Sequence, residues 1–344
     1  MLLIIPEIVI ASTVCVILEN IAVVLMWFGN WYGFYIVQKE VEGDSDADVP
    51  VGAVNLESVH SEKPICEGLE TQPQPVDHNV NLVEKEELTD IGIQKTIQAS
   101  NVFKMLQQNN IPTSFIDLTS PNTMLHEECN MLPLEFVVRR YAFGSYLKRN
   151  PEYDNKPEPY CFKEPVWEIF HKHAVVMPPN VNEPVQMDEN EAREKYLVDG
   201  KWADGVYTDP YIKLGDQWEL YSAKDPIKGE ALMTSKILLN PQEIDSAINK
   251  IVIPSFKAIE KSWKNISTSD GPVHLVDIKF ELGFRSKDKL LVLSDVVDND
   301  SWRIWPGGNP GNQLDKQSFR DGEDLSQVAN KYQLVTELTK EFIK

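Results

Sequence analysis

Hydrophobic and polar residues alternate from Leu275 to Phe284, which predicts a β-strand with one face in the core. The apolar face is formed by alternate residues, namely Ile278, Phe280 and Leu282. The polar face is formed by the residues between them, namely Asp277, Lys279 and Glu281. A polar turn follows, and then a second apolar run at 290–297. The two runs are therefore predicted to form a hairpin that brings Asp295 back beside the polar face.

Apolar residues recur every three or four positions in three further stretches, and this spacing predicts helices. The first covers 93–106. The second begins at Asn240, a suitable helix cap, followed by Pro241 as first helical residue. Pro254 predicts a kink or a break farther along this helix, because proline cannot donate a backbone hydrogen bond. The third helix, at 325–342, is expected to pack against the core without carrying chemistry.

Residues 1–37 differ from the rest, because they contain no Lys or Arg and only two acidic residues, Glu7 and Glu19. Their length suits a membrane span. Aromatic residues could form an interfacial belt, namely Trp27, Trp31, Tyr32 and Tyr35. Against a span, Glu19 would lie in its middle, where an ionised group is costly. A membrane anchor with a cytosolic C-terminal domain, buried strands and an incorrectly assigned first exon are therefore three open alternatives for this hydrophobic segment.

Residues 38–88 are acidic and rich in turn-forming residues, so we expect a disordered linker. Order is expected to return with a third unit, 89–344. The formal charge of −20 over 344 residues argues against a nucleic-acid-binding surface but permits an anionic substrate in a basic cleft. The cysteines lack metal-binding spacing, which favours free thiols in a reducing compartment, and they are Cys15, Cys66, Cys129 and Cys161.

Charged residues of both signs are concentrated around the predicted hairpin. Besides its polar face and Asp295, they are Asp298, Asp300, Arg303, Lys316 and Arg320. A solvated strand face would explain the alternating charges alone, but not an aspartate, Asp295, that follows the apolar run Leu290–Leu293. Carboxylates gathered so closely need a counter-charge such as Mg²⁺. Neighbouring Arg and Lys suit a phosphate. Together they indicate ATP-dependent chemistry.

A second motif, PLEFVVRRYAFGSYLKRNP at 133–151, begins as a predicted strand and ends in a cationic loop. Gly144 would let the backbone approach a ligand, and the Ser145 hydroxyl could donate to a phosphate oxygen. A solvated basic face is the alternative explanation for these residues.

These two motifs, in this order, resemble the SAICAR synthetase family, and most closely the synthetase half of the animal bifunctional protein that also contains aminoimidazole ribotide carboxylase. The resemblance covers about Thr89 to Lys344. It implies an α+β fold of two lobes, related to ATP-grasp, with ATP between the lobes. It also implies a cytoplasmic ligase that forms a C–N bond. With ATP and Mg²⁺, this ligase would join L-aspartate to carboxyaminoimidazole ribotide, forming SAICAR in purine (IMP) biosynthesis.

The resemblance implies roles for individual residues. Those near ATP and Mg²⁺ would be Lys172, Glu281 and Asp295, with Asp209 as a third metal ligand. Asp209-Pro210 and Asp225-Pro226 are rival matches for that last position. The ribotide would be bound by Arg139, Ser145 and Arg303, with Arg303 also reaching aspartate. Lys279 would lie at the reacting carboxylate, where Asp277 and Asp300 would orient the amine or nearby basic groups. Trp305, Lys316 and Arg320 match family positions and could equally be structural.

The N-terminal part departs from the family pattern. The family has a strand–glycine-loop–strand motif resembling Y-E-G-K-x-K that closes over the nucleotide phosphates, whereas Gly43 stands in the acidic run EVEGDSDAD. We therefore expect the glycine-loop lobe to be degraded or replaced. A non-catalytic paralogue that binds the ribotide or a partner is accordingly the alternative to an active ligase, and a homo-oligomer stays open.

Overall fold

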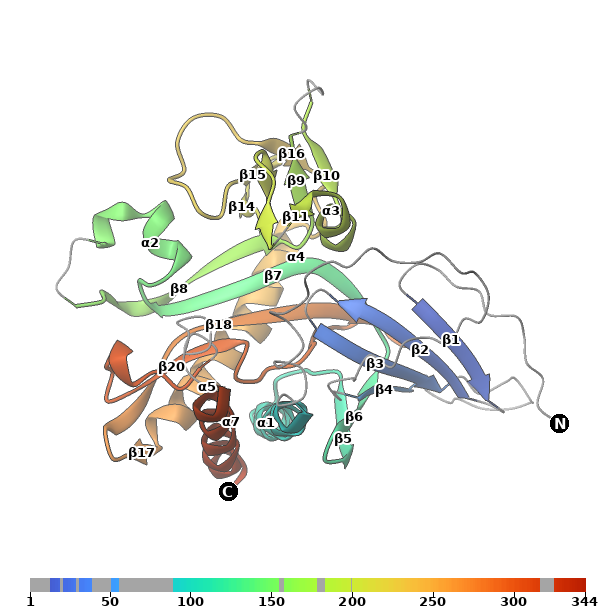
Figure 1. The fold of residues 1–344 in the computed structure, drawn as a ribbon, viewed down its shortest axis with the longest axis vertical. Coiled ribbons are helices and arrows are strands. Elements are labelled where there is room, and N and C mark those ends of the chain that lie inside the picture. Colours follow the sequence, from blue (N-terminus) through green and yellow to red (C-terminus); the bar gives the residue numbers. More distant parts are fainter. Residues whose placement is uncertain are drawn as a thin grey trace, which may run out of the picture.

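The computed structural model describes residues 13–18, 21–28, 31–38, 51–55, 89–154, 158–177, 183–198, 200–315 and 325–344. Strands and helices are mixed along the chain, which confirms the expected α+β class (Figure 1).

The main sheet has the strand order β16-β15-β14-β8-β7-β18-β17, and β19 and β20 also pair with β18. Its long strands are β7 (Cys129–Tyr141), β8 (Cys161–His171) and β18 (Gly271–Arg285). The shorter ones are β14 (Tyr211–Lys213), β15 (Trp218–Tyr221), β16 (Met233–Ser235), β17 (Ser267–Thr268), β19 (Leu291–Ser294) and β20 (Trp302–Pro306). β18 is central, because β7 pairs with one of its edges and β19 and β20 with the other.

The predicted hairpin is confirmed as β18 and β19. In its antiparallel register Glu281 faces Ser294 and Leu282 faces Leu293. Asp295 therefore follows the last residue of β19, at the same end of the hairpin as Glu281. The chain leaves the strand there with a positive φ of 60° at Asp295, a conformation that is uncommon for a residue with a side chain.

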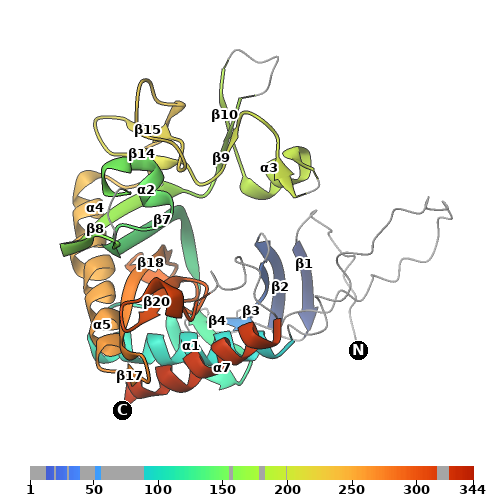
Figure 2. The ribbon, with the colours of Figure 1, turned by 60° about the vertical axis from the view of Figure 1, so that its left-hand side comes forward.

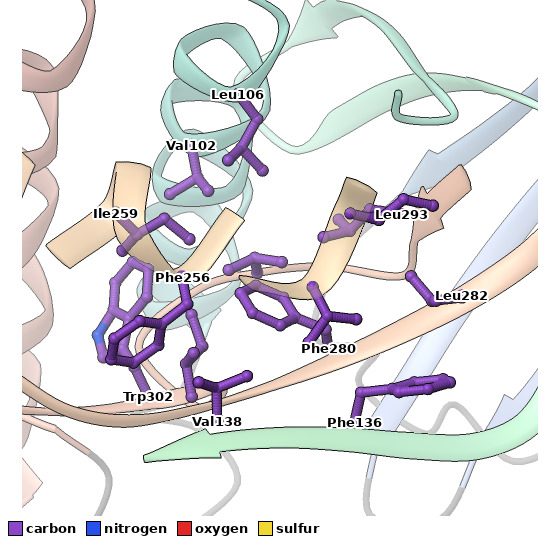
Figure 3. Close-up of a cluster of buried hydrophobic side chains, with 14 of the residues drawn as sticks. Val102, Leu106, Phe136, Val138, Phe256, Ile259, Phe280, Leu282, Leu293 and Trp302 are labelled. Atoms are coloured by element: carbon purple, nitrogen blue, oxygen red, sulfur yellow. The ribbon is translucent and has the colours of Figure 1, made fainter. Parts of the chain in front are cut away.

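The core lies on the apolar face of β7 and β18, where Phe136 is paired with Phe280 and Val138 with Ile278. Figure 3 shows Phe136, Val138 and Phe280 with residues of two helices, namely Val102, Leu106, Phe256 and Ile259. The helices are α1 (Thr89–Gln108), at the first predicted helix, and α5 (Ile253–Lys264). Figure 2 shows α5 running along one side of this sheet.

The second predicted helix begins as expected. Asn240 caps α4 (Pro241–Ala247) in a reciprocal capping box with Glu243. The break expected near Pro254 is a π-helical segment, Ile248–Val252, which leads directly into α5. Such a wider turn suits a position before Pro254, because proline has no backbone N–H to donate to the preceding turn.

The third predicted helix is α7 (Leu325–Thr339), which continues as a short 3₁₀ turn, Lys340–Ile343. α7 lies beside α1 (Figures 1 and 2). Gln98 of α1 is fully buried and donates to the Tyr332 carbonyl at 2.9 Å and to the Thr336 hydroxyl at 3.0 Å. These hydrogen bonds fix the register between the two helices.

A second sheet has the order β1-β2-β3-β4-β6-β5. Its strands are β1 (Thr13–Leu18), β2 (Ile21–Phe28), β3 (Trp31–Gln38), β4 (Val51–Asn55), β5 (Phe115–Ser120) and β6 (Thr123–Glu127). The described part of 1–37 thus forms strands, one of the alternatives for this segment, and not a helical span. Among the described residues, no helix combines the length and the apolar character needed to cross a membrane. β4 falls within the predicted linker, whereas Gly43 lies outside the described residues.

The remaining elements form a small group beside β8. They are β9 (Ala174–Val176), β10 (Val185–Met187), α3 (Glu189–Tyr196), β11 (Leu197–Val198), β12 (Lys201–Trp202) and β13 (Val206–Tyr207). This group has a small core of its own, formed by Ala174, Val176 and Ala192.

Candidate active site

The polar face of the main sheet holds most of the predicted site residues. The strand register aligns Asp277 of β18 with Arg139 of β7 on one side and with Arg303 of β20 on the other. Four residues farther along β18, Glu281 is aligned with Glu135 of β7. Paired positions in a sheet project their side chains to the same face, so the alternation in the sequence becomes a patch of charged rows.

Asp277 lies between two arginines. Its Oδ2 accepts from Arg139 at 2.6 Å and from Arg303 at 2.5 Å. Arg139 is 3% exposed and also donates to Glu168 of β8 at 2.7 Å, so its charge is balanced inside the protein. Arg303 retains 21% side-chain exposure and presents the more accessible guanidinium. An anion entering the site would therefore meet Arg303 more directly than Arg139.

The cationic loop follows β7 and leads into the short helix α2 (Ser145–Arg149) and a 3₁₀ turn, Pro151–Tyr153. Gly144 has a φ of +61°, and a Cβ there would lie 3.1 Å from an Arg303 guanidinium nitrogen. A glycine at this position thus permits both the left-handed backbone and the close approach of Arg303. Arg149 is buried and pairs with Glu168 at 2.6 Å, so it supports the sheet instead of facing a ligand.

A chain of alternating lysines and carboxylates lies at the other end of the polar face. Glu281 accepts from Lys172 at 2.6 Å and from Lys279 at 2.5 Å, and Lys279 also donates to Glu135 at 3.0 Å. Burial opposes ionisation of Glu281, but the two lysines outweigh it and lower the pKa of this carboxyl to about 2. Glu281 is therefore anionic and Lys172 and Lys279 are cationic at neutral pH.

For two predicted metal ligands, the nearby lysines do not outweigh burial and the neighbouring carboxylates. Burial, followed by the charge of Glu281, raises the pKa of Asp295 to about 7. Burial, followed by Glu135 and Glu189, raises the pKa of Asp209 to about 7. Asp209, like Asp295, has a positive φ, at 46°. Such strained, incompletely neutralised carboxylates are found at functional sites more often than elsewhere.

The donor set fits Mg²⁺ in one arrangement. Within the part of the chain that the structure describes, no three acidic, His or Cys side chains are placed to hold a metal together. Mg²⁺, however, usually takes one or two carboxylates and completes its shell with water and substrate phosphates. Glu281 and Asp295 suit that role, because Glu281 exerts the strongest charge effect on the pKa of Asp295, whereas for Asp209 that charge is Glu135. The rival Asp225 is exposed and accepts from Ser222 at 2.5 Å.

A pocket of about 240 Å³ opens beside Arg139 and Arg303. The predicted residues that line it are Arg139, Ser145, Asp277, Lys279, Asp300 and Arg303. The structure thus brings all predicted catalytic and ribotide-binding residues to one cavity. Trp305 is fully buried against Phe143 and Tyr141 and does not line it. Lys316 and Arg320 lie outside the described residues.

Sequence reasoning missed several site residues. Glu135 lines the pocket and pairs with Lys279, and Glu168 bridges Arg139 and Arg149. Glu135 could have been found, because it lies four residues before Arg139 and therefore on the same face of the predicted strand. Tyr332 of α7 donates to the Asp300 carboxylate, and no local pattern in the predicted packing helix signals that contact.

A small pocket lined by arginines, a lysine and carboxylates on one sheet face is suited to a compact ligand carrying negative charge. The model of the SAICAR synthetase family matches residues 79–199 and 222–338, which is more than half of the chain. The chain therefore belongs to the SAICAR synthetase family.

Individual relatives agree with this assignment. The chain is 31% identical over 249 residues to the phosphoribosylaminoimidazole-succinocarboxamide synthase of Herpetosiphon aurantiacus. The aligned region covers 71% of this chain and 78% of that protein. It is 32% identical over 253 residues to the protein named Multifunctional protein ADE2 of Gallus gallus. Here the aligned region covers 71% of this chain and 47% of that protein. The chain thus spans about half of the latter relative.

Solved structures agree on the fold. The crystal structure of phosphoribosylaminoimidazole-succinocarboxamide synthase from Ehrlichia chaffeensis has a TM-score of 0.52 and 17% identity, with 92% of this chain and 98% of that chain covered. At this identity the likeness concerns the fold alone.

Proposed function

We propose that the chain is an ATP-dependent ligase that joins L-aspartate to carboxyaminoimidazole ribotide and forms SAICAR, ADP and phosphate in de novo purine biosynthesis. One observation carries the proposal: Asp277, Lys279 and Arg303 line a single pocket beside the Lys172–Glu281 pair, within the segment matched by the family model. A cytoplasmic location is part of the same proposal.

The chemistry explains why this site needs both signs of charge. A carboxylate repels an amine and has no good leaving group, so an oxygen of the ribotide carboxylate first attacks the γ-phosphorus of ATP and ADP leaves. The amine of L-aspartate then attacks the acyl carbon, phosphate leaves and the amine loses a proton. Dividing one difficult step into two lowers the barrier, and the protein supplies positioning and charge neutralisation.

The residues divide this work. Lys279 lies at the reacting carboxylate and balances its charge, while Lys172 balances charge on the ATP phosphates. Arg303, supported by Asp277 and Arg139, holds the ribotide phosphate or a carboxylate of aspartate. Ser145 donates to the ribotide. Glu281 and Asp295 would hold Mg²⁺, which when bound neutralises the phosphates and makes the γ-phosphorus more electrophilic.

The test is a turnover assay with the full chain, ATP, Mg²⁺, the ribotide and L-aspartate. We expect release of ADP only when both organic substrates are present, with SAICAR detected by mass spectrometry. Lys279→Met should lower kcat by about a hundredfold, because it removes a cation from the reacting carboxylate. Lys257→Met is the matched control, since Lys257 is an exposed lysine whose Glu164 partner lies 3.7 Å away.

An alternative outcome is equally informative. Ribotide binding by calorimetry, with no ADP released under any substrate combination, would contradict the ligase proposal. It would favour the non-catalytic paralogue expected if the glycine-loop lobe is degraded.

A further inference from the structure

The carboxylate of Asp300 is held by two helices that are distant from it in the sequence. Lys95 of α1 donates to Oδ2 at 2.9 Å, and the Tyr332 hydroxyl of α7 donates to Oδ1. Each oxygen therefore has its own donor, and the two donors approach from different helices. This arrangement fixes the rotation of the carboxylate about its side-chain bonds, because any rotation would break at least one contact.

The same two helices also fix the backbone beside Asp300. The Gln98 side-chain oxygen accepts from the Asn299 N–H at 3.0 Å, while its nitrogen donates to the Tyr332 carbonyl at 2.9 Å. Gln98 and Asn299 are both fully buried. The Asn299 side chain in turn donates to the Leu314 carbonyl at 2.8 Å. The loop between β19 and β20 is thus anchored on the α1–α7 pair.

Helix packing alone does not account for this contact. Tyr332 is 5% exposed, and burial, followed by the charge of Asp300, raises the pKa of its hydroxyl, so it stays a hydrogen-bond donor. Burying a carboxylate against a helix costs more than packing an apolar pair there. Asp300 nevertheless borders the pocket, together with Lys279 and Arg303. A fixed anion in this wall suits the ammonium group of an amino acid, which needs a hydrogen-bond acceptor.

We infer that Lys95 and Tyr332 are positioning residues that hold Asp300 so that it orients the amine of the amino-acid substrate. The inference rests on the proposed ligase function for its substrate, and on the contacts above for its geometry. Among the described residues, α1 and α7 contribute no side chain to the pocket lining. The inference gives these two helices a part in the reaction through Asp300.

The experiment compares the 344-residue chain with its Tyr332→Phe variant. This change removes one hydroxyl and keeps the ring that packs between the helices. We expect kcat/KM for L-aspartate to fall about tenfold, while KM for ATP changes by less than about twofold, because a small misplacement of an orienting group acts on the substrate it orients. Tyr221→Phe is the matched control, since its hydroxyl donates to Glu219 at 3.2 Å outside the pocket.

Two further measurements separate positioning from general damage. In an Asp300→Asn background, Tyr332→Phe should cause no additional loss, because the two residues act through one group. A crystal structure of Tyr332→Phe should show the Asp300 carboxylate displaced by roughly 1 Å or more. This structural result decides the positioning claim even if the wild-type chain releases no ADP, an outcome that would contradict the proposed function instead. An unmoved carboxylate, an unchanged kcat/KM for L-aspartate or independent losses in the double variant would overturn the inference.

Discussion

Asp295 destabilises the ligand-free protein at neutral pH, because its carboxylate is buried next to the negative charge of Glu281. Its pKa rises from 3.8 to about 7 on folding. A carboxyl with a raised pKa binds more protons in the folded than in the unfolded state. Its contribution to stability is therefore present below pH 4 and is lost as the pH rises through 7. The positive φ of this residue adds backbone strain.

Asp295→Asn should consequently stabilise the protein and abolish its activity. At pH 8 we expect the melting temperature of the ligand-free variant to be about 3 °C above wild type, corresponding to about 1 kcal/mol. At pH 5 the gain should be clearly smaller, because the carboxyl of the folded wild type is then protonated. Thermal unfolding at both pH values checks this. An equal gain at pH 5 and 8 would show that ionisation is not its cause.

At the scale of elements, β18 and its neighbours illustrate what local sequence can predict. Period-two alternation correctly placed Asp277, Lys279 and Glu281 on one face and gave the hairpin with β19. Contacts between segments that are distant in the sequence could not be predicted from local patterns. Lys95 meets Asp300 across 205 positions of sequence, and nothing near either residue encodes that contact.

Arg139 shows the same limit. The sequence made it a candidate ligand group, yet the fold pairs it with Glu168 and Asp277 and leaves it buried. Which charges neutralise one another is decided by strand order and register, and these depend on the whole sheet. The sequence could therefore predict the residues of the candidate site better than their division into groups that face a ligand and groups that support others.

The loop between β7 and α2 contains Gly144, whose missing side chain leaves room for Arg303. Gly144→Ala should displace Arg303, because the new methyl group would lie 3.1 Å from its guanidinium. We expect KM for the ribotide to rise about tenfold and stability to fall by about 1–2 kcal/mol from the left-handed backbone. Gly229→Ala is the control, since Gly229 has a similar φ of +78° but no atom within 4 Å of a new Cβ. An unchanged ribotide KM in Gly144→Ala, or an equal rise in the control, would contradict this role.

At the scale of the whole molecule, the site joins parts of the chain that are far apart in sequence. β7 and β20 supply Arg139 and Arg303, β18 supplies the Asp277 between them, and α1 and α7 hold Asp300. A ligand that bridges these parts binds only when all are in place, so its binding energy should stabilise the fold as a unit.

ATP with Mg²⁺ should therefore raise the melting temperature of the full chain. At a ligand concentration of about a hundred times Kd the gain is about 2.7 kcal/mol, which corresponds to roughly 5–10 °C. Chelating the metal with EDTA should remove most of this gain, because uncompensated phosphates would then face Glu281 and Asp295. Mg²⁺ without nucleotide serves as the reference. A shift that survives EDTA unchanged would exclude a metal-dependent nucleotide site.

The central position of β18 has a consequence for the dynamics of the site. Its backbone is hydrogen-bonded to β7 along one edge and to β19 and β20 along the other, and the Lys279 amide itself donates to Ser301 at 2.8 Å. Amide hydrogens in such a strand exchange with solvent only when the sheet as a whole opens. The backbone beneath Asp277, Lys279 and Glu281 should accordingly be among the slowest-exchanging in the protein, so that motions during turnover are confined to the side chains and loops around a rigid floor.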